Sequence, residues 1–357
     1  MTVPRIAFPV ALIGYGYAGK TIHAPLIDAI PGLRLAVIAS RHADKVLADW
    51  PAVEVTADAA AAATHPEIEL VVIASPNETH APLAEAALRA GKHVVVDKPF
   101  TVTLEQARRL AALATAEQRL LSVFQNRRWD SDFLAAQAVI REGHLGEVLH
   151  FESHIDRYRP AVQARWREQA GPGSGVWYDL GPHLADQALQ LFGLPAAVTA
   201  RLVCQRPSAQ TEDWAHVMLH YDHLEVILHA SMLAAGGVPR FVVHGTAGSW
   251  VKHGIDSQEA SLKAGQRPGG LTWGEDPVPG CLYEGTTTSP RKIPAPPGDY
   301  RRYYAEVQRA VAGDAPNPVP PIQAIAVMAV VETALKAAGD GKTLRLTLTE
   351  RERNSWH

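Results

Sequence analysis

Residues 91–100 read GKHVVVDKPF, a short apolar run with an ionisable pair directly behind it. Consecutive valines are typical of a buried strand, and Pro99 ends the strand because proline has no N–H to donate to a sheet. In an open parallel sheet, ligands bind beyond the carboxyl ends of the strands. Lys98 therefore stands where a side chain can take part in proton transfer. On this stretch alone an exposed Asp97–Lys98 pair in a loop is the simpler interpretation, so the surrounding sequence has to decide.

A glycine-rich loop follows the first predicted strand, where residues 10–19 read VALIGYGYAG. Gly14, Gly16 and Gly19 occupy the three glycine positions of the pattern G-x-G-x-x-G. Such a loop makes a tight turn, brings the backbone close to a pyrophosphate and lets the next helix pack on the strand. The pattern alone recurs by chance, but here a strand precedes it and a predicted helix, residues 20–29, follows it. This context favours dinucleotide binding.

The end of the second predicted strand, residues 33–40, bears on the choice of cofactor. In an NAD-binding unit, an acidic residue about 20 positions beyond the glycines binds the ribose 2′-OH. This chain has Ser40 and Arg41 at that point instead of an acid. A hydroxyl and a guanidinium suit a 2′-phosphate. The sequence therefore predicts NADP in preference to NAD, with a solvent-exposed Arg41 of no special role as the alternative.

Strand and helix signals alternate through the rest of the first third. The predicted strands are residues 53–55, 70–75, 93–96 and 120–124, and the predicted helices are 79–90 and 103–116. Alternation of this kind builds a doubly wound parallel sheet. We therefore expect an α/β Rossmann domain over residues 1–125 and a second domain over residues 126–357.

Composition narrows the class of protein. The 357 residues carry a formal net charge of only −3, so no electrostatic signature suggests nucleic acid or a membrane surface as a partner. Cys204 and Cys281 are isolated and in no metal-binding or redox spacing. We find no secretion signal and no run of roughly 18 apolar residues that would span a membrane. A cytoplasmic location is expected.

Three motifs together resemble the Gfo/Idh/MocA family of glucose–fructose oxidoreductases, inositol dehydrogenases and rhizopine-catabolism proteins. They are the glycine loop, SPNETH at residues 75–80 and AGKHVVVDKPF at residues 90–100. Members usually carry Glu-Lys-Pro where this chain has Asp97-Lys98-Pro99, one methylene shorter. The resemblance implies that Lys98 lies beside the nicotinamide and the substrate hydroxyl. The residues it implies at the cofactor are Gly14, Gly16, Tyr17, Ala18, Gly19, Ser40, Arg41, Ser75, Pro76, Asn77, His80, Asp97, Lys98 and Arg127.

A further motif lies in residues 173–191, GSGVWYDLGPHLADQALQL. It resembles the D-x-x-x-H pattern of the family at Asp179 and His183. Pro182 suits the first turn of a helix, which would place His183 in that turn and Asp179 just before it. A lone histidine at a helix start is more often a capping or core residue. Together with Lys98, the pair favours catalysis, so all three are expected to bind substrate and to carry the reaction.

Other candidate residues come from the resemblance alone. Arg127 and Arg128, within FQNRRWDSDF at residues 124–133, resemble paired arginines at the entry to the second domain of family members. They either shape the active-site wall or form a structural salt bridge between the domains, and both alternatives stay open. Asp156 and Trp166 lie where the substrate loop of the family would be, so both are expected to bind substrate.

Residues 147–158, EVLHFESHIDRY, alternate as an antiparallel strand does, with His150, Glu152, His154 and Asp156 on one face. Two histidines four positions apart on a strand can indicate a metal. The sequence shows no ligand cluster around them, so we predict no metal site.

The last part of the chain reads mainly as strands and then helices. The predicted strands are residues 197–204, 214–221, 224–233, 241–245 and 343–348, the helices are 300–311 and 322–338, and an irregular excursion covers 265–298. This pattern predicts an α+β domain with a large, mostly antiparallel, open-faced sheet. An open face has to be covered, and the resemblance implies a homodimer or homotetramer formed through it.

The resemblance implies an enzyme that reversibly oxidises a secondary alcohol of a cyclic polyol or sugar with NADP, or else NAD. His183 would be the general base, Lys98 would hold the same oxygen, and Asp179 would bind a neighbouring hydroxyl. Ser40 and Arg41, together with FQNRRWDSDF and DLGPHLADQAL, most resemble the NADP-dependent scyllo-inositol dehydrogenases. The first expected substrate is therefore scyllo- or myo-inositol.

Three alternatives remain. An aldose or other sugar dehydrogenase of the same family differs only in loops that set specificity. A glycoside hydrolase that uses a tightly held NAD would show no net cofactor reduction. A non-catalytic cofactor-binding sensor is expected to lack one of the catalytic positions, and this chain keeps Lys98, Asp179 and His183.

Overall fold

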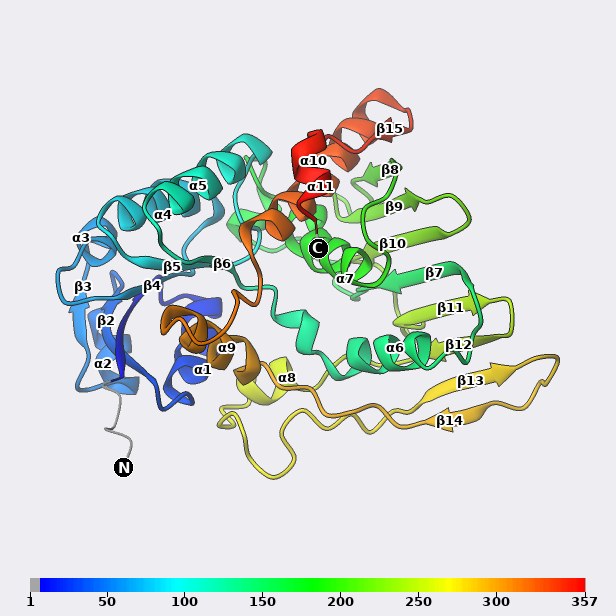
Figure 1. Ribbon diagram of the computed structural model, residues 1–357, viewed down its shortest axis with the longest axis horizontal. Coiled ribbons are helices and arrows are strands. Elements are labelled where there is room, and N and C mark those ends of the chain that lie inside the picture. Colours follow the sequence, from blue (N-terminus) through cyan, green and yellow to red (C-terminus); the bar gives the residue numbers. More distant parts are fainter. Residues whose placement is uncertain (1–6, 357) are drawn as a thin grey trace. The chain divides into compact units, whose positions relative to one another are not determined.

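The computed structural model describes residues 7–356 and divides into two compact units (Figure 1). The first unit comprises the chain up to Asn126 together with Gln258–Trp273 and Asp299–Ala324. The second comprises Arg127–Ser257, Gly274–Gly298 and the chain from Ile325 onward. The first unit therefore holds more than residues 1–125, because two later segments return to pack with it.

The first unit is built on a parallel sheet of six strands in the order β3-β2-β1-β4-β5-β6. The strands are β1 (Phe8–Ile13), β2 (Leu33–Ala39), β3 (Glu54–Thr56), β4 (Leu70–Ile73), β5 (His93–Val96) and β6 (Leu121–Val123). This confirms the predicted doubly wound parallel sheet. The strand order reverses beside β1, and ligands of such sheets bind outside the carboxyl ends at that reversal.

Helices cover both sides of this sheet. After a π-helical turn, Ala18–His23, come α1 (Ala24–Asp28), α2 (Ala43–Asp49), α3 (Ala59–Ala63), α4 (His80–Arg89, after a 3₁₀ turn at Asn77–Thr79), α5 (Leu104–Ala116), α8 (Gln258–Lys263) and α9 (Arg301–Val311). Figure 1 shows α4 and α5 on one side and α1 and α9 on the other. Thr103 and Gln106 form a capping box that begins α5 close to the predicted start.

The returning segment 299–324 is tied to β6 by hydrogen bonds. The hydroxyl of Tyr303 donates to Ser122 Oγ at 2.9 Å, and Ser122 Oγ donates to the Val319 carbonyl at 3.3 Å. Asn317 donates its amide to the Leu121 carbonyl at 2.8 Å. These contacts cover the edge of the sheet at β6, and no local pattern in the sequence predicts them.

The second unit is built on a nine-stranded sheet in the order β14-β13-β12-β11-β7-β10-β9-β8-β15. The strands are β7 (Val148–His154), β8 (Ala197–Val203), β9 (Trp214–His220), β10 (Glu225–Ser231), β11 (Phe241–Gly245), β12 (Gly248–Lys252), β13 (Gly280–Glu284), β14 (Arg291–Ile293) and β15 (Leu344–Arg345). Only β7 and β10 pair in parallel, so the predicted mostly antiparallel sheet is confirmed.

The excursion predicted to be irregular contains a hairpin. Residues 265–298 include β13 and β14, which extend the edge of the sheet beyond β12. Both strands are short and surrounded by glycine and proline, so their sequence carries little strand signal. Pairing with β12 supplies the stabilisation that the local sequence lacks.

One face of the nine-stranded sheet packs against helices. The helices of this unit are α6 (Ser131–Arg141), α7 (Val176–Phe192), most of α10 (Pro321–Asp340) and α11 (Glu350–Asn354), with 3₁₀ turns at Asn126–Trp129 and Trp166–Glu168. α7 lies against β9 and β10, and Phe192 at its end packs on Phe151 of β7 with ring centroids 5.1 Å apart. The alternate residues of the same strands therefore point to the opposite face.

α7 begins at Val176, six residues before the predicted start at Pro182. Gly175 precedes it at a φ of +97°, which a residue with a side chain rarely adopts. A Cβ on Gly181 would lie 2.6 Å from the Trp177 ring, so this glycine lets the indole pack flat against the helix. Burial of the helix compensates for the missing N–H of Pro182 inside it. Asp179 thus lies in the first turn, and His183 lies one turn later.

α10 is long and apolar enough to cross a membrane, judged by length and composition alone. A buried core helix passes the same test, and 61% of its most apolar window is buried. Gln323, Glu332 and Lys336 interrupt the apolar run, which is why the sequence did not suggest a span. The length and composition of α10 are therefore weak evidence for a membrane span.

Candidate active site

The glycine loop of the first unit has the geometry of a dinucleotide cradle. A Cβ on Gly14 would lie 2.6 Å from the Ala74 carbonyl oxygen, and one on Gly19 would lie 2.0 Å from that of Gly14. Gly16 is exposed, and a Cβ there would meet nothing within 4 Å. The first and third glycines therefore serve close packing, while the backbone at Gly16 is open to a pyrophosphate. These residues fit the cofactor that the loop predicts.

Two of the predicted cofactor residues lie at the carboxyl end of β2. Ser40 Oγ accepts a hydrogen bond from the His42 N–H at 3.1 Å, and Arg41 is exposed. β2 pairs with β1, so this end lies beside the strand that carries the glycine loop. Tyr17 in the loop is also exposed, and its hydroxyl donates to Glu259 of α8 at 2.7 Å.

His80 joins the loops that follow β4 and β5. Its Nδ1 lies 2.9 Å from the Pro99 carbonyl oxygen, and its Nε2 lies 3.0 Å from that of Ser75. Burial lowers the pKa of His80 and outweighs the charge of Asp97 and the carbonyl contacts, which raise it. A neutral imidazole carries one N–H, so the ring donates to only one of the two carbonyl oxygens. Asn77 is buried beside it, whereas Pro76 is exposed. The predicted cofactor residues of SPNETH thus lie in and around the 3₁₀ turn that follows β4.

A buried carboxylate follows β5. Asp97 Oδ1 accepts the N–H of half-buried Lys98 at 2.8 Å and lies 3.6 Å from His23 Nε2. The other nitrogen of His23 hydrogen bonds the Tyr304 hydroxyl at 2.5 Å. Burial raises the pKa of Asp97, but His23 and the nearby charges of Lys98 and His80 outweigh it and hold that pKa below its ordinary value. Asp97 is therefore a charged carboxylate in a buried position.

Sequence reasoning missed His23 and Tyr304. His23 lies in the π-helical turn directly behind the glycine loop, but its partners come from β5 and α9. Its only local signal is that it stands four residues after the last glycine of the cofactor motif. Its contacts depend on the returning segment that carries Tyr304.

In the second unit, Asp179 is bracketed by two arginines. Asp179 Oδ2 lies 3.6 Å from Arg157 Nη1, and Oδ1 lies 3.4 Å from Arg167 Nη1. The Arg167 guanidinium stacks over the Trp166 ring at 5.1 Å from its centroid. His183 follows Asp179 by four residues on the same helix, so the two side chains share one face. The structure thus brings together Trp166, Asp179 and His183 from the predicted set and adds Arg167, which the sequence analysis missed.

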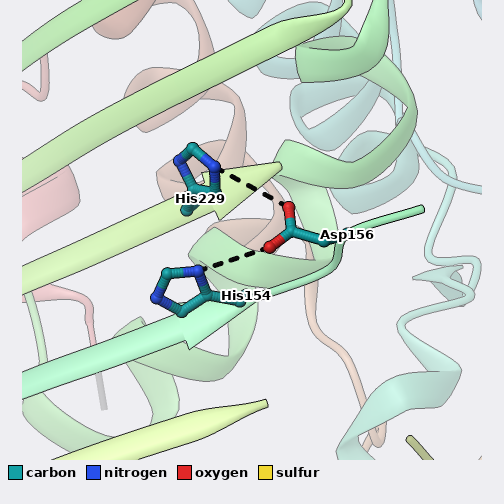
Figure 2. A group of neighbouring side chains, drawn as sticks. All are labelled: His154, Asp156 and His229. Carbon is teal, nitrogen blue, oxygen red and sulfur yellow. Dashed lines mark ion pairs between the residues drawn. The ribbon is translucent and has the colours of Figure 1, made fainter. Parts of the chain in front are cut away.

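Asp156, the remaining predicted substrate residue, faces the sheet. Its Oδ2 lies 3.5 Å from His154 Nδ1, and its Oδ1 lies 3.8 Å from His229 Nε2 (Figure 2). A cluster of metal-ligand type therefore does accompany the histidines of β7. The sequence did not show it because His229 comes from β10, far along the chain.

Arg127 and Arg128 form ion pairs that, among the described residues, lie within the second unit. Arg127 Nη1 lies 2.9 Å from Asp130 Oδ2, and Arg128 forms a bidentate pair with Asp186 at 2.6 and 2.8 Å. Gln187 Nε2 donates to the Arg127 carbonyl at 2.9 Å. These contacts anchor the start of α6 to α7, the helix that carries Asp179 and His183.

Comparison with known families settles the class. The profile of an oxidoreductase family with an NAD-binding Rossmann fold (GFO_IDH_MocA) matches residues 8–125, and the profile of the C-terminal alpha/beta domain of that family matches residues 137–346. The chain belongs to the Gfo/Idh/MocA family. The predicted family is therefore confirmed, and this Gfo/Idh/MocA protein is an NAD(P)-binding oxidoreductase.

Individual relatives span nearly the whole chain. The "Uncharacterized oxidoreductase YdgJ" of Escherichia coli is 55% identical over 94% of this chain and 98% of its own length. The "scyllo-inositol 2-dehydrogenase (NADP(+)) IolW" of Bacillus subtilis is 38% identical over 94% of this chain and 95% of its own. A crystal structure from Klebsiella pneumoniae matches with a TM-score of 0.93 at 53% identity, covering 98% of both chains.

Proposed function

We propose that this Gfo/Idh/MocA protein is an NADP-dependent dehydrogenase that oxidises a secondary alcohol of a cyclic polyol, with scyllo- or myo-inositol as the first candidate. The observation that carries the proposal is the start of α7, where a carboxylate and an imidazole lie one turn apart on one helix face. A carboxylate suits a polyol substrate, because it can accept a hydrogen bond from one hydroxyl while a neighbouring hydroxyl reacts.

The arginines beside Asp179 support a substrate role for this carboxylate. Arg157 and Arg167 both pair with it, and both guanidiniums remain partly exposed. The guanidiniums lie 3.6 and 3.4 Å from the Asp179 oxygens, longer than tight hydrogen bonds. Trp166 beside them offers an aromatic face to the apolar side of a sugar ring.

Each catalytic side chain has one role in the proposal. The glycine loop and the strand ends of the first unit would hold NADP, which when bound would supply the hydride acceptor for the carbinol carbon. His183 takes the proton of the reacting hydroxyl, since an imidazole titrates near neutral pH. Lys98 donates a hydrogen bond to the same oxygen and stabilises its developing negative charge. Asp179 accepts a hydrogen bond from a neighbouring hydroxyl and orients the ring. The proposal requires Lys98 of the first unit to meet the α7 pair in the working enzyme.

Preference for NADP is part of the proposal. Ser40 and the exposed Arg41 stand at the carboxyl end of β2, where an NAD-binding unit has an acid. The relative IolW is named as an NADP(+) enzyme, which agrees with this assignment.

The test is reduction of the nicotinamide by purified protein, followed by absorbance, with NADP or NAD and a panel of inositols and aldoses. We expect NADPH formation with an inositol. Turnover of aldoses alone would replace the polyol assignment with a sugar dehydrogenase. Release of an aglycone from glycosides without net reduction would indicate a hydrolase. Cofactor binding without turnover of any compound would indicate a sensor.

We also propose that a second copy of the chain covers the face of the nine-stranded sheet opposite α7. Trp214, Met218 and Ile227 are half-buried there, and Ile227 lies directly opposite Met218 on the neighbouring strand. Light scattering should give a dimer or tetramer. Ile227→Asp should shift the mass toward the monomer, because it places a charge in an apolar contact. A monomeric wild-type protein would contradict the proposal.

A further inference from the structure

Two neighbouring strands place two histidines and an aspartate together on the sheet face opposite α7. His154 ends β7, and His229 lies directly beside it in the parallel register of β10. Asp156 follows two residues after β7 and turns its carboxylate toward both rings (Figure 2). One atom from each of the three residues lies within 4.8 Å of the others. None of them belongs to α7, which carries the proposed catalytic pair.

The distances between these groups are close to those of a coordination shell. Zinc binds imidazole nitrogen and carboxylate oxygen at about 2.0–2.2 Å, so ligand atoms around a tetrahedral ion stand about 3.4 Å apart. The separations are 3.5 Å between His154 Nδ1 and Asp156 Oδ2, and 3.8 Å between His229 Nε2 and Asp156 Oδ1. Both are long for direct hydrogen bonds. His154 Nδ1 and Asp156 Oδ1 are buried and make no hydrogen bond among the described residues.

Neighbouring side chains orient both rings toward Asp156. His154 Nε2 bonds Glu152 Oε2 at 2.8 Å, and the other oxygen of Glu152 bonds His150 at 2.8 Å. His229 Nδ1 lies 3.3 Å from His216 Nδ1. The remaining nitrogens, Nδ1 of His154 and Nε2 of His229, therefore face the carboxylate. Histidines that bind metals are oriented in this way, because the second ring nitrogen donates to a carboxylate or another acceptor and so selects the tautomer.

We propose that His154, Asp156 and His229 bind a divalent transition-metal ion of the Zn²⁺ type. Two imidazoles and a carboxylate form a donor set that suits zinc and its neighbours in the transition series better than Mg²⁺ or Ca²⁺, which prefer oxygen ligands. Three protein ligands leave at least one position for a solvent molecule or another group. Neither His154 nor His229 has a role in the proposed dehydrogenase activity, so substitutions of these two histidines test the metal site separately.

A proton competes with the metal for this site. Burial lowers the pKa of His154, but the carboxylates of Asp156 and Glu152 outweigh it and raise that pKa above its ordinary value. Burial lowers the pKa of both His229 and His216.

The experiment is calorimetric titration of Zn²⁺ into the whole chain after removal of metals with a chelator, with Co²⁺ absorption as a second probe of the ligand set. We expect one Zn²⁺ per chain, and at least about tenfold weaker binding in His229→Gln and in His154→Gln. The matched control is His244→Gln, because His244 stacks on His150 on the same face, outside the cluster.

The outcomes are distinct. Unchanged Zn²⁺ affinity in a folded His229→Gln protein would overturn the proposal, as would wild-type protein that binds no zinc. Thermal unfolding without metal shows whether each variant is folded, and either histidine variant suffices if the other fails to fold. Polyol oxidation by metal-free protein tests the dehydrogenase separately, so failure of one proposal leaves the other standing.

Discussion

The carboxyl end of β5 and the first turn of α7 each hold an aspartate of the predicted site, in opposite surroundings. Asp97 is buried, and its neighbours are His23 and the backbone N–H of Lys98. Asp179 is partly exposed, and two arginines with exposed edges stand beside it. A buried carboxylate that is already satisfied positions what lies around it, whereas an accessible one can bind a ligand. These surroundings fit our proposal that Asp97 belongs to the framework of the cofactor side and Asp179 to the substrate side.

The largest expected effect is on kcat, and it tests whether the end of β5 and the start of α7 both contribute catalytic groups. Lys98→Ala and His183→Ala should each lower kcat by about 10²–10⁴-fold, because each removes a group positioned for proton transfer or charge stabilisation. Steady-state kinetics with NADP and a polyol measures this. Lys45→Ala, which changes an exposed lysine of α2, is the control. A near wild-type kcat in either variant would confine the chemistry to one region.

Loss of the contacts of His23 with Asp97 and Tyr304 should lower the free energy of unfolding. His23→Phe deprives buried Asp97 and the Tyr304 hydroxyl of a partner, so the free energy of unfolding should fall by about 2–4 kcal/mol. Urea denaturation measures it, with His42→Phe at an exposed histidine as the control. Loss of activity without loss of stability would instead give His23 a direct role and weaken the contrast with α7.

On the cofactor side, Arg41→Ala should raise the KM for NADP by about 10–100-fold, because a charge-assisted contact to the 2′-phosphate is lost. The KM for NAD and for the polyol should change little. Kinetics with both cofactors measures this. Equal effects on NADP and NAD would show that Arg41 does not read the 2′-phosphate.

Protonation of Asp97 should destabilise the fold. Its pKa is lowered in the folded protein, so its contribution is complete above the ordinary aspartate pKa and is lost as pH falls through the folded value. Between about pH 6 and about pH 3, the unfolding free energy of wild type should fall more steeply than that of Asp97→Asn. Parallel slopes in urea denaturation would mean that this carboxylate is not preferentially charged in the folded state.

The smallest effect is expected on the substrate side. Arg167→Ala should raise the KM for the polyol by about 3–10-fold with little change in the KM for NADP, because a partly exposed ion pair contributes modestly. Arg167→Lys should recover part of the loss. An increase in the KM for NADP instead would place Arg167 on the cofactor side and contradict the assignment of Asp179 and its arginines to the substrate.

Most residues of the candidate site were predicted from the sequence because their signals are local. The glycine loop, the order Asp97-Lys98-Pro99 and the spacing of Asp179 and His183 each lie within one short window. The start of α7 was not readable, since Pro182 reads as a helix start and only the packing of Trp177 on Gly181 shows that the helix continues through it. Arg167 was missed because nothing near it in the sequence points to Asp179.

Local sequence specified the alternation of strands and helices, the cofactor loop and the helix face that carries Asp179 and His183. Backbone geometry relates residues a few positions apart, so these features follow from spacing alone. The tertiary structure decided that His23 meets Asp97 and Tyr304, and that His229 meets His154 and Asp156. Those contacts depend on strand register and on a returning segment, which join residues far apart in the chain through packing that no short window contains.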